Sequence, residues 1–135
     1  MKVKYYDLEN KRVFITGGGS GIGASIVEHF CEQGSEVYFI DINEDESKKL
    51  IEDIKNKNYS LPTFIKCDLL NIKELQKTIA DILSNKGPID ILINNAANDT
   101  RHKIDDVTEE YWNERINVNL RHFFFTVQSV KKSMI

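Results

Sequence analysis

Short hydrophobic runs alternate with amphipathic stretches along most of the chain. The runs at 13–15 and 37–40 are continuous, which is typical of strands covered on both faces. Elsewhere, apolar residues recur at three- and four-residue spacing, as in Leu50, Ile51 and Ile54, and this predicts amphipathic helices. The predicted strands are 12–16, 36–41, 63–66 and 89–93. The predicted helices are 21–33, 44 to about 58, 72–84, and a long helix that is capped by Thr108 and reaches about 134.

Strands that alternate with helices in this way are parallel and are joined by right-handed crossovers. We therefore expect a single α/β domain over residues 1–135. Its core is predicted to be a doubly wound, Rossmann-type parallel sheet with strand order 3-2-1-4 and helices on both faces. Such sheets bind ligands outside the carboxyl ends of their strands, where the strand order reverses. The expected ligand site therefore lies between the ends of the first and fourth strands.

Composition narrows the class of protein. The 135 residues include 18 Lys and Arg against 21 Asp and Glu, a net charge of −3, and they form no basic patch that would favour nucleic acid. The first ten residues lack the apolar core of a signal peptide, and no apolar run approaches the length of a membrane span. The only cysteines, Cys31 and Cys67, lack metal-ligand spacing. We expect a cytoplasmic protein with reduced thiols, no metal site and no membrane partner.

The most informative segment is TGGGSGIG at 16–23, between the first predicted strand and its helix. Glycines let a backbone turn sharply and approach a pyrophosphate closely, and the free N–H groups of the following helix favour phosphate. Asp41 ends the second strand, 18 residues after Gly23. A carboxylate at this place accepts hydrogen bonds from an adenosine ribose and repels a 2′-phosphate. The segment therefore predicts dinucleotide binding, with NAD rather than NADP as the cofactor.

Each signal also has a structural interpretation. The glycines can serve as a turn alone, and Asp41 can be a surface acid that ends a strand. Asp68 can cap a turn, and Asn95 can form one. Asn119 falls on a predicted helical stripe and can be a core residue that bonds only its own backbone. The other members of that stripe are Trp112, Ile116, Phe123 and Val127.

Other residues whose side chains could take part in binding or catalysis are given a structural interpretation. The segment 101–103 is interpreted as an exposed, solvated loop, and His29 and His122 as structural residues on helices. The glycine segment alone also leaves open an S-adenosylmethionine methyltransferase, which likewise pairs a glycine turn with an acid after the second strand. The rest of the sequence separates these alternatives.

The spacing Thr-Gly-x-x-x-Gly-x-Gly at 16–23 resembles the short-chain dehydrogenase/reductase family. Three further elements match that family in order: Cys67-Asp68-Leu69, Asn94-Asn95-Ala96-Ala97 and Asn117-Val118-Asn119-Leu120. A methyltransferase does not explain the second and third of these. Within the family, the segments 95–103 and 111–122 look like the bacterial xylose 1-dehydrogenases and related aldose dehydrogenases. The resemblance implies oxidation of the anomeric hydroxyl of a sugar to a lactone with NAD.

The resemblance also implies a role for each matching residue. The pyrophosphate and the nearby ribose would be lined by Gly17, Ser20, Gly21, Ile22 and Gly23. The adenosine would be held by Asp41, Ile42, Asp68 and Leu69. The nicotinamide ribose would lie against Asn95, Ala96 and Ala97, with Val118 packed behind. Asn119 would hold a water in the proton relay to the catalytic lysine, and Asp99 or His102 would contact sugar hydroxyls.

The sequence departs from the family in two ways. Ala97 stands where the family usually has glycine, which we expect to be tolerated. Family members are usually about double this length, and their catalytic serine and Tyr-x-x-x-Lys follow the helix at which this chain stops. The 135 residues contain no Tyr-x-x-x-Lys. Because losing a general acid–base group costs about 10²–10⁴ in rate, we expect the chain alone to be nearly inactive.

Two further expectations concern assembly and an alternative function. The C-terminal half of the usual fold is expected to be missing. In this family the long helix packs against its copy in a second subunit, so the resemblance implies a homo-oligomer formed through that helix. The alternative to a dehydrogenase is a catalytically silent module that binds NAD or a protein partner.

Overall fold

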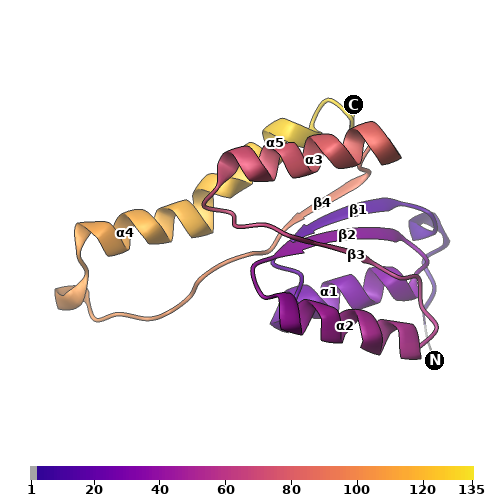
Figure 1. Cartoon of the computed structure of the whole chain (residues 1–135), viewed down its shortest axis with the longest axis horizontal. Coiled ribbons are helices and arrows are strands. Elements are labelled where there is room, and N and C mark those ends of the chain that lie inside the picture. The colour runs from indigo at the N-terminus through magenta and orange to yellow at the C-terminus, as the bar shows by residue number, and fades with distance from the viewer. Residues whose placement is uncertain (1–2) are drawn as a thin grey trace.

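The computed structural model describes residues 3–135 and contains the four-stranded parallel sheet that the sequence predicts (Figure 1). The strands are β1 (Arg12–Thr16), β2 (Glu36–Asp41), β3 (Thr63–Lys66) and β4 (Ile91–Asn94), in the order β3-β2-β1-β4. The helices are α1 (Gly21–Glu32), α2 (Glu44–Asn56), α3 (Ile72–Lys86), α4 (Glu109–Ile116) and α5 (His122–Val130). Two 3₁₀ turns, η1 (Tyr6–Leu8) and η2 (Ile104–Asp106), and a π-helical segment, η3 (Asn117–Arg121), complete the described elements. The α/β class and the strand order are confirmed.

The sheet is covered on both faces, as the continuous hydrophobic runs predict. Figure 1 shows α1 and α2 below it and α3 and α5 above it. Successive residues of β1 and β2 point to opposite faces, so each strand contributes to two clusters. The α1/α2 cluster contains Val13, Ile15, Val27, Cys31, Val37, Phe39, Leu50 and Ile54. The α3/α5 cluster contains Phe14, Tyr38, Ile40, Cys67, Leu75, Ile79, Ile82, Ile89 and Val130.

The fourth strand begins two residues later than predicted and ends one residue later. The expected strand was 89–93, whereas β4 is Ile91–Asn94. Asp90 explains the late start, because its backbone N–H donates to the Arg12 carbonyl at 2.9 Å and its carboxylate accepts from the Arg12 N–H at 2.8 Å. The Asp90 side chain thus occupies the Arg12 N–H, and the ladder begins with Ile91 opposite Val13. The predicted ends of the first three helices fall within two residues of those observed.

The long C-terminal helix is not uniform, and the predicted stripe through Asn119 is wrong. Its path consists of α4, η3 and α5, and α5 ends at Val130 rather than near 134. A π-helical segment adds a residue to the turn and so rotates the helix faces that follow it. Val127, after this segment, is 49% exposed, and Trp112, on the arm before it, is 61% exposed. The buried residues of α5 are instead His122, Thr126 and Val130.

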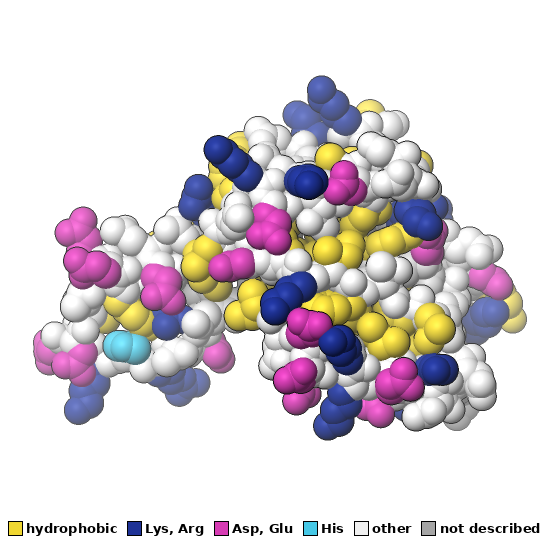
Figure 2. All heavy atoms as spheres, in the orientation of Figure 1, with side chains coloured by type: hydrophobic (Ala, Val, Ile, Leu, Met, Phe, Trp, Pro, Cys, Tyr) yellow, Lys and Arg dark blue, Asp and Glu magenta, His cyan; other side chains and the backbone are white. Residues whose placement is uncertain are grey.

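Residues 98–116, which we call the arm, project from the body of the molecule. Figures 1 and 2 show α4 and the extended segment before it standing away from the sheet, with a hollow between them and the body. Large apolar side chains of the arm and of the helix beyond it are exposed, among them Ile104, Trp112, Leu120 and Phe124. Within residues 3–135, no helix combines the length and apolar character needed to cross a membrane.

Truncating a core residue is expected to destabilise the fold. Ile79 on α3 is fully buried in the α3/α5 cluster. Ile79→Ala removes buried apolar volume and leaves a cavity, so we expect the free energy of unfolding to fall by about 2–5 kcal/mol in urea titrations. Ile104→Ala is the matched control because Ile104 is 88% exposed, and it should change that free energy by less than about 0.5 kcal/mol. Equal effects of the two variants would contradict the observed core.

Candidate cofactor pocket

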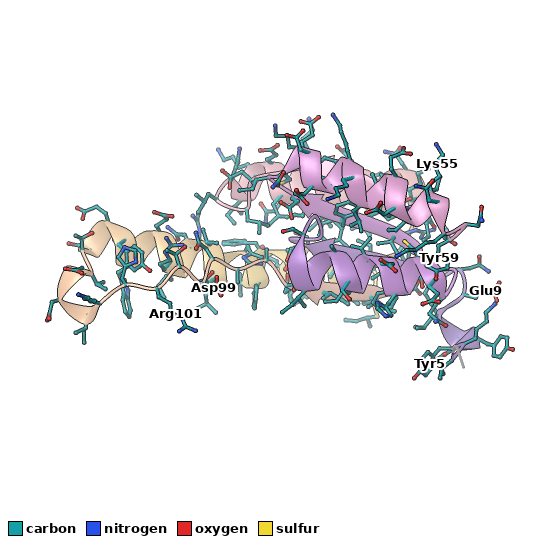
Figure 3. The ribbon with its side chains drawn as sticks, turned by 90° about the horizontal axis from the view of Figure 1, so that it is seen from below. Tyr5, Glu9, Lys55, Tyr59, Asp99 and Arg101 are labelled. Atoms are coloured by element: carbon teal, nitrogen blue, oxygen red, sulfur yellow. The ribbon has the colours of Figure 1, made fainter. Side chains whose placement is uncertain are left out.

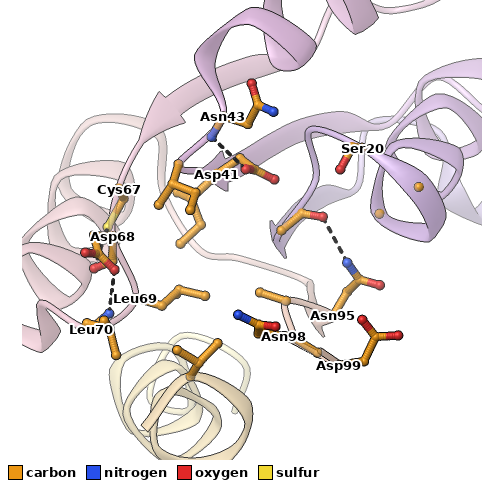
Figure 4. Close-up of a pocket in the computed structure, with 18 of the residues that line it drawn as sticks. Ser20, Asp41, Asn43, Cys67, Asp68, Leu69, Leu70, Asn95, Asn98 and Asp99 are labelled. Carbon is orange, nitrogen blue, oxygen red and sulfur yellow. Dashed lines mark hydrogen bonds between the residues drawn. The ribbon is translucent and has the colours of Figure 1, made fainter. Parts of the chain in front are cut away.

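A pocket of about 780 Å³ lies at the carboxyl ends of the strands (Figure 4). It is bounded by the loop between β1 and α1, the ends of β2 and β3, the turn after β4, and the helix at α4 and η3. All thirteen residues for which a cofactor role was predicted line it: Gly17, Ser20, Gly21, Ile22, Gly23, Asp41, Ile42, Asp68, Leu69, Asn95, Ala96, Ala97 and Val118. The sequence thus predicted which segments converge at this edge of the sheet.

The glycine loop depends on close backbone approaches. Gly17 has a φ of +66°, and a Cβ on it would lie 2.7 Å from the Cα of Ala96. A Cβ on Gly23 would lie 1.8 Å from the carbonyl oxygen of Gly17. The N-cap of α1, Ser20, makes no side-chain capping bond, so its hydroxyl and the first N–H groups of the helix remain available on the pocket side. This arrangement suits an anion such as a pyrophosphate.

Asp41 is held rigidly at the end of β2. One carboxylate oxygen, Oδ2, accepts from the Gly19 N–H and the other, Oδ1, from the Asn43 N–H, each at 2.9 Å. Asn43 in turn caps α2 by accepting from the Glu46 N–H at 3.2 Å. Each carboxylate oxygen has more than one lone pair, so both can still accept from a ribose hydroxyl. The carboxylate therefore orders the glycine loop and also presents negative charge to the pocket.

The loop after β3 contributes a second ordered acid. Asp68 Oδ1 accepts from the Leu70 N–H at 2.9 Å, which is the turn-capping bond of the structural interpretation, and the residue lines the pocket as well (Figure 4). Cys67 beside it is buried, and burial raises the pKa of its thiol to about 11. This thiol remains protonated at neutral pH and contributes only shape to the wall.

The turn after β4 is tied to the end of β1. The Thr16 hydroxyl oxygen accepts from the backbone N–H groups of Asn95 and Ala96, at 3.0 and 3.1 Å. The Asn95 amide donates to the carbonyls of Thr16 and Gly17, at 3.2 and 2.9 Å. The Asn95 amide nitrogen is therefore directed at the glycine loop. Asn95 also helps to form the turn after β4, in agreement with its structural interpretation.

Asn119 does not line this pocket. Its Oδ1 accepts from the Asn98 N–H at 2.7 Å, and its Nδ2 donates to the Asn98 carbonyl at 3.0 Å. It therefore bonds the backbone of a segment 21 residues away, rather than only its own as the structural interpretation held. This pair of bonds fixes the helix at η3 to the start of the arm.

A second cleft, of about 540 Å³, runs along the arm and meets the pocket at Asn98 and Asp99. Figure 3 shows Asp99 and Arg101 on the extended segment beside α4. The Tyr111 hydroxyl donates to the Thr100 carbonyl at 2.7 Å, and the His102 ring packs on the Tyr111 ring at 3.9 Å. The segment 101–103 is thus partly ordered by ring contact rather than only solvated.

Arg115 gives this second cleft positive charge. Its guanidinium lies 4.7 Å from the Tyr111 ring, and its side chain is 18% exposed. Within residues 3–135, its Nε and Nη1 are buried without a hydrogen-bond partner. Buried N–H donors favour an oxygen acceptor, so the cleft suits a polar molecule.

Sequence reasoning missed several pocket residues. They are Ile40, Asn43, Cys67, Leu70, Asn98 and Glu114, and Asp99 had been assigned only to substrate. Most are chain neighbours of predicted residues. Glu114 precedes Val118 by one helical turn, a spacing that would have identified it. Among the described residues, no group of three or more His, Cys, Asp or Glu side chains is placed to bind a metal ion.

Comparisons with known proteins agree with this architecture. The sequence model of the short chain dehydrogenase family matches residues 11–135. The chain is 47% identical over 130 residues to a D-xylose 1-dehydrogenase of Caulobacter vibrioides, an alignment that covers 96% of this chain and 50% of the relative. It is 41% identical over 131 residues to a probable galactose dehydrogenase of Rhizobium meliloti, with 97% and 51% covered. The chain thus spans about half the length of the curated relatives it matches.

Solved structures share the fold. The ligand-free aldohexose dehydrogenase of Thermoplasma acidophilum superposes with a TM-score of 0.81 at 28% identity, covering 96% of this chain and 46% of that one. A match to the family over nearly the whole chain, together with this shared fold, establishes membership: the chain belongs to the short chain dehydrogenase family.

Proposed function

We propose that residues 1–135 form the NAD-binding part of a sugar dehydrogenase, which oxidises the anomeric hydroxyl of an aldose to a lactone. The observation that carries this proposal is the pocket itself, where the glycine loop, the fixed Asp41 carboxylate and the turn after β4 converge. Relatives named as xylose and galactose dehydrogenases support a sugar substrate. The cysteines are free and buried, which suits the reducing cytoplasm, and we propose that location.

The residues present fit a dinucleotide. The open N-terminus of α1 and the Ser20 hydroxyl would hold the pyrophosphate, and Asp41 would accept from the adenosine ribose. Asp68 and Leu69 would face the adenine, and the backbone at 95–97 would lie along the nicotinamide ribose, with Val118 behind it. A bound nicotinamide would supply the acceptor for a hydride from the substrate carbon. The two bonds to Asn98 fix the position from which Asn119 would hold the water of the proton relay.

Removing the Asp41 carboxylate tests cofactor identity. Asp41→Ala removes the ribose acceptor and the charge that repels a 2′-phosphate, so we expect NAD affinity to fall about 10-fold or more and the preference for NAD over NADP to shrink. Isothermal titration with each cofactor measures both quantities.

Asp41→Asn is the matched control, because it removes the charge and retains an oxygen that can accept from a backbone N–H. It should relax the preference with a smaller loss of NAD affinity. Unchanged affinity of Asp41→Ala for both cofactors would show that Asp41 is only a strand terminus.

We propose that the 135 residues bind NAD without turnover, because they contain no Tyr-x-x-x-Lys. The same observation favours a second candidate, a silent module that binds NAD or a partner. We expect the purified chain to bind NAD and to form no NADH with D-xylose or D-galactose.

The coding DNA after the Ile135 codon separates the two candidate functions. An open reading frame with a serine and Tyr-x-x-x-Lys supports the dehydrogenase, and a stop codon supports the silent module. NADH formation by the chain alone would contradict both.

We also propose that the chain self-associates through its long helix. Ile116, Leu120 and Phe124 follow one another at four-residue spacing and are 41%, 59% and 63% exposed, which leaves an uncovered apolar face. Leu120→Glu places a charge in this face and should convert an associated species to a smaller one in analytical ultracentrifugation. Ser25→Glu adds the same charge at an exposed position of α1, on the opposite side of the sheet from α5, and should leave the species unchanged. A wild-type chain that stays monomeric at high concentration would rule out this interface.

A further inference from the structure

His122 lies between the helix at Val118, which lines the pocket, and the end of β1 at Thr16. It is the first residue of α5, directly after the π-helical segment, and it is fully buried. Its Nδ1 lies 2.7 Å from the Val118 carbonyl oxygen, and its Nε2 lies 3.4 Å from the Thr16 hydroxyl oxygen. Val118 lines the pocket, and Thr16 carries the turn after β4. The ring therefore connects the helix wall of the pocket with its sheet wall.

The hydrogen bonds around Thr16 determine which way its proton points. The hydroxyl oxygen already accepts from the N–H groups of Asn95 and Ala96. A hydroxyl has two acceptor lone pairs and one proton, so its lone pairs are fully used and its proton is left to donate. His122 Nε2 is the acceptor within reach, at the long distance of 3.4 Å. Nε2 must therefore be unprotonated.

The other ring nitrogen gives the same result independently. A carbonyl oxygen only accepts, so the 2.7 Å contact with Val118 requires a proton on Nδ1. The opposite tautomer would place the Nδ1 lone pair against that carbonyl, and a charged ring would direct a second proton at an oxygen that has no free lone pair. Burial also lowers the pKa of His122, outweighing the Val118 carbonyl, which raises it. The ring is neutral and protonated on Nδ1.

We propose that His122 is a positioning residue for cofactor binding: as the neutral Nδ1–H tautomer, it fixes the Val118 carbonyl relative to the Thr16 hydroxyl and so sets the separation of two pocket walls. This inference rests on the proposed function, since NAD is the molecule between those walls. Without the ring nitrogens, the Thr16 hydroxyl can rotate and weaken its bonds to Asn95 and Ala96. The π-helical segment would then lose a tie to the sheet.

His122→Phe tests the proposal because it retains a buried ring and removes both nitrogens. We expect the variant to bind NAD about tenfold more weakly by isothermal titration, the effect of losing one or two hydrogen bonds. His122→Asn restores an amide donor near the position of Nδ1 and should recover part of that affinity.

His29→Phe is the matched control. His29 Nδ1 makes the same local contact, 2.7 Å from the Ser25 carbonyl one helical turn earlier, but the residue is exposed on α1. This variant should bind NAD as the wild type does. A folded His122→Phe with wild-type affinity would overturn the proposal, and loss of stability without loss of affinity would assign His122 to packing alone.

Long-range ¹H–¹⁵N spectra of the histidine rings give a readout that needs no cofactor. We expect the His122 ring to show a protonated Nδ1 and a bare Nε2 at neutral pH, and observation of the other tautomer or of a charged ring would overturn the proposal. Failure of the wild-type chain to bind NAD would instead refute the proposed function and leave the tautomer result standing. The spectra also decide the matter if His122→Phe does not fold.

Discussion

The Thr16 hydroxyl joins the two strands on whose ends the pocket depends. It accepts both backbone N–H groups of the turn after β4, while the Asn95 amide donates back to the carbonyls of Thr16 and Gly17. These bonds draw the turn so close to β1 that only glycine fits at position 17, where any Cβ would collide with Ala96. The same interaction thus explains why position 17 requires glycine, and it fixes the position of the turn after β4, which lines the pocket.

The remaining walls are arranged around this junction. Parallel strands end at one edge of the sheet, so the acids after β2 and β3 arrive at the same edge as the glycine loop. The helix is attached at three places: His122 to Thr16, Thr126 to the Asn94 side chain at 2.8 Å, and Asn119 to the Asn98 backbone. Each attachment meets the chain at or just after β1 or β4. The π-helical segment contains Asn119 and ends directly before His122, so it lies where the helix passes from its contact with the arm to its contacts with the sheet.

The features that were predictable from sequence are those decided by local pattern. Continuous runs such as 37–40 identified buried parallel strands, and the distance from Gly23 to Asp41 placed the acid at the edge shared with the glycine loop. The π-helical segment was not predicted, because no local pattern marked it, and Asn119 within it bonds the backbone of Asn98, 21 residues away. Its omission misplaced the apolar stripe, since one additional residue in a turn changes which side chains face the core. Within residues 3–135, the burial of the two Arg115 nitrogens without a hydrogen-bond partner likewise depends on how the segment before α4 lies against that helix.

At Asp41, a structural role and the cofactor-binding role that we propose are compatible. Its two carboxylate oxygens accept from the Gly19 and Asn43 N–H groups, so the residue is a strand terminus in the structural sense. Those same bonds hold the carboxylate in one orientation before any ligand arrives. A group that is already ordered loses little conformational entropy on binding, and its remaining lone pairs face a fixed position. These structural bonds would therefore favour the ribose-binding role that we propose for Asp41. The same reasoning applies to Asp68, whose bond to the Leu70 N–H orders its carboxylate beside the pocket.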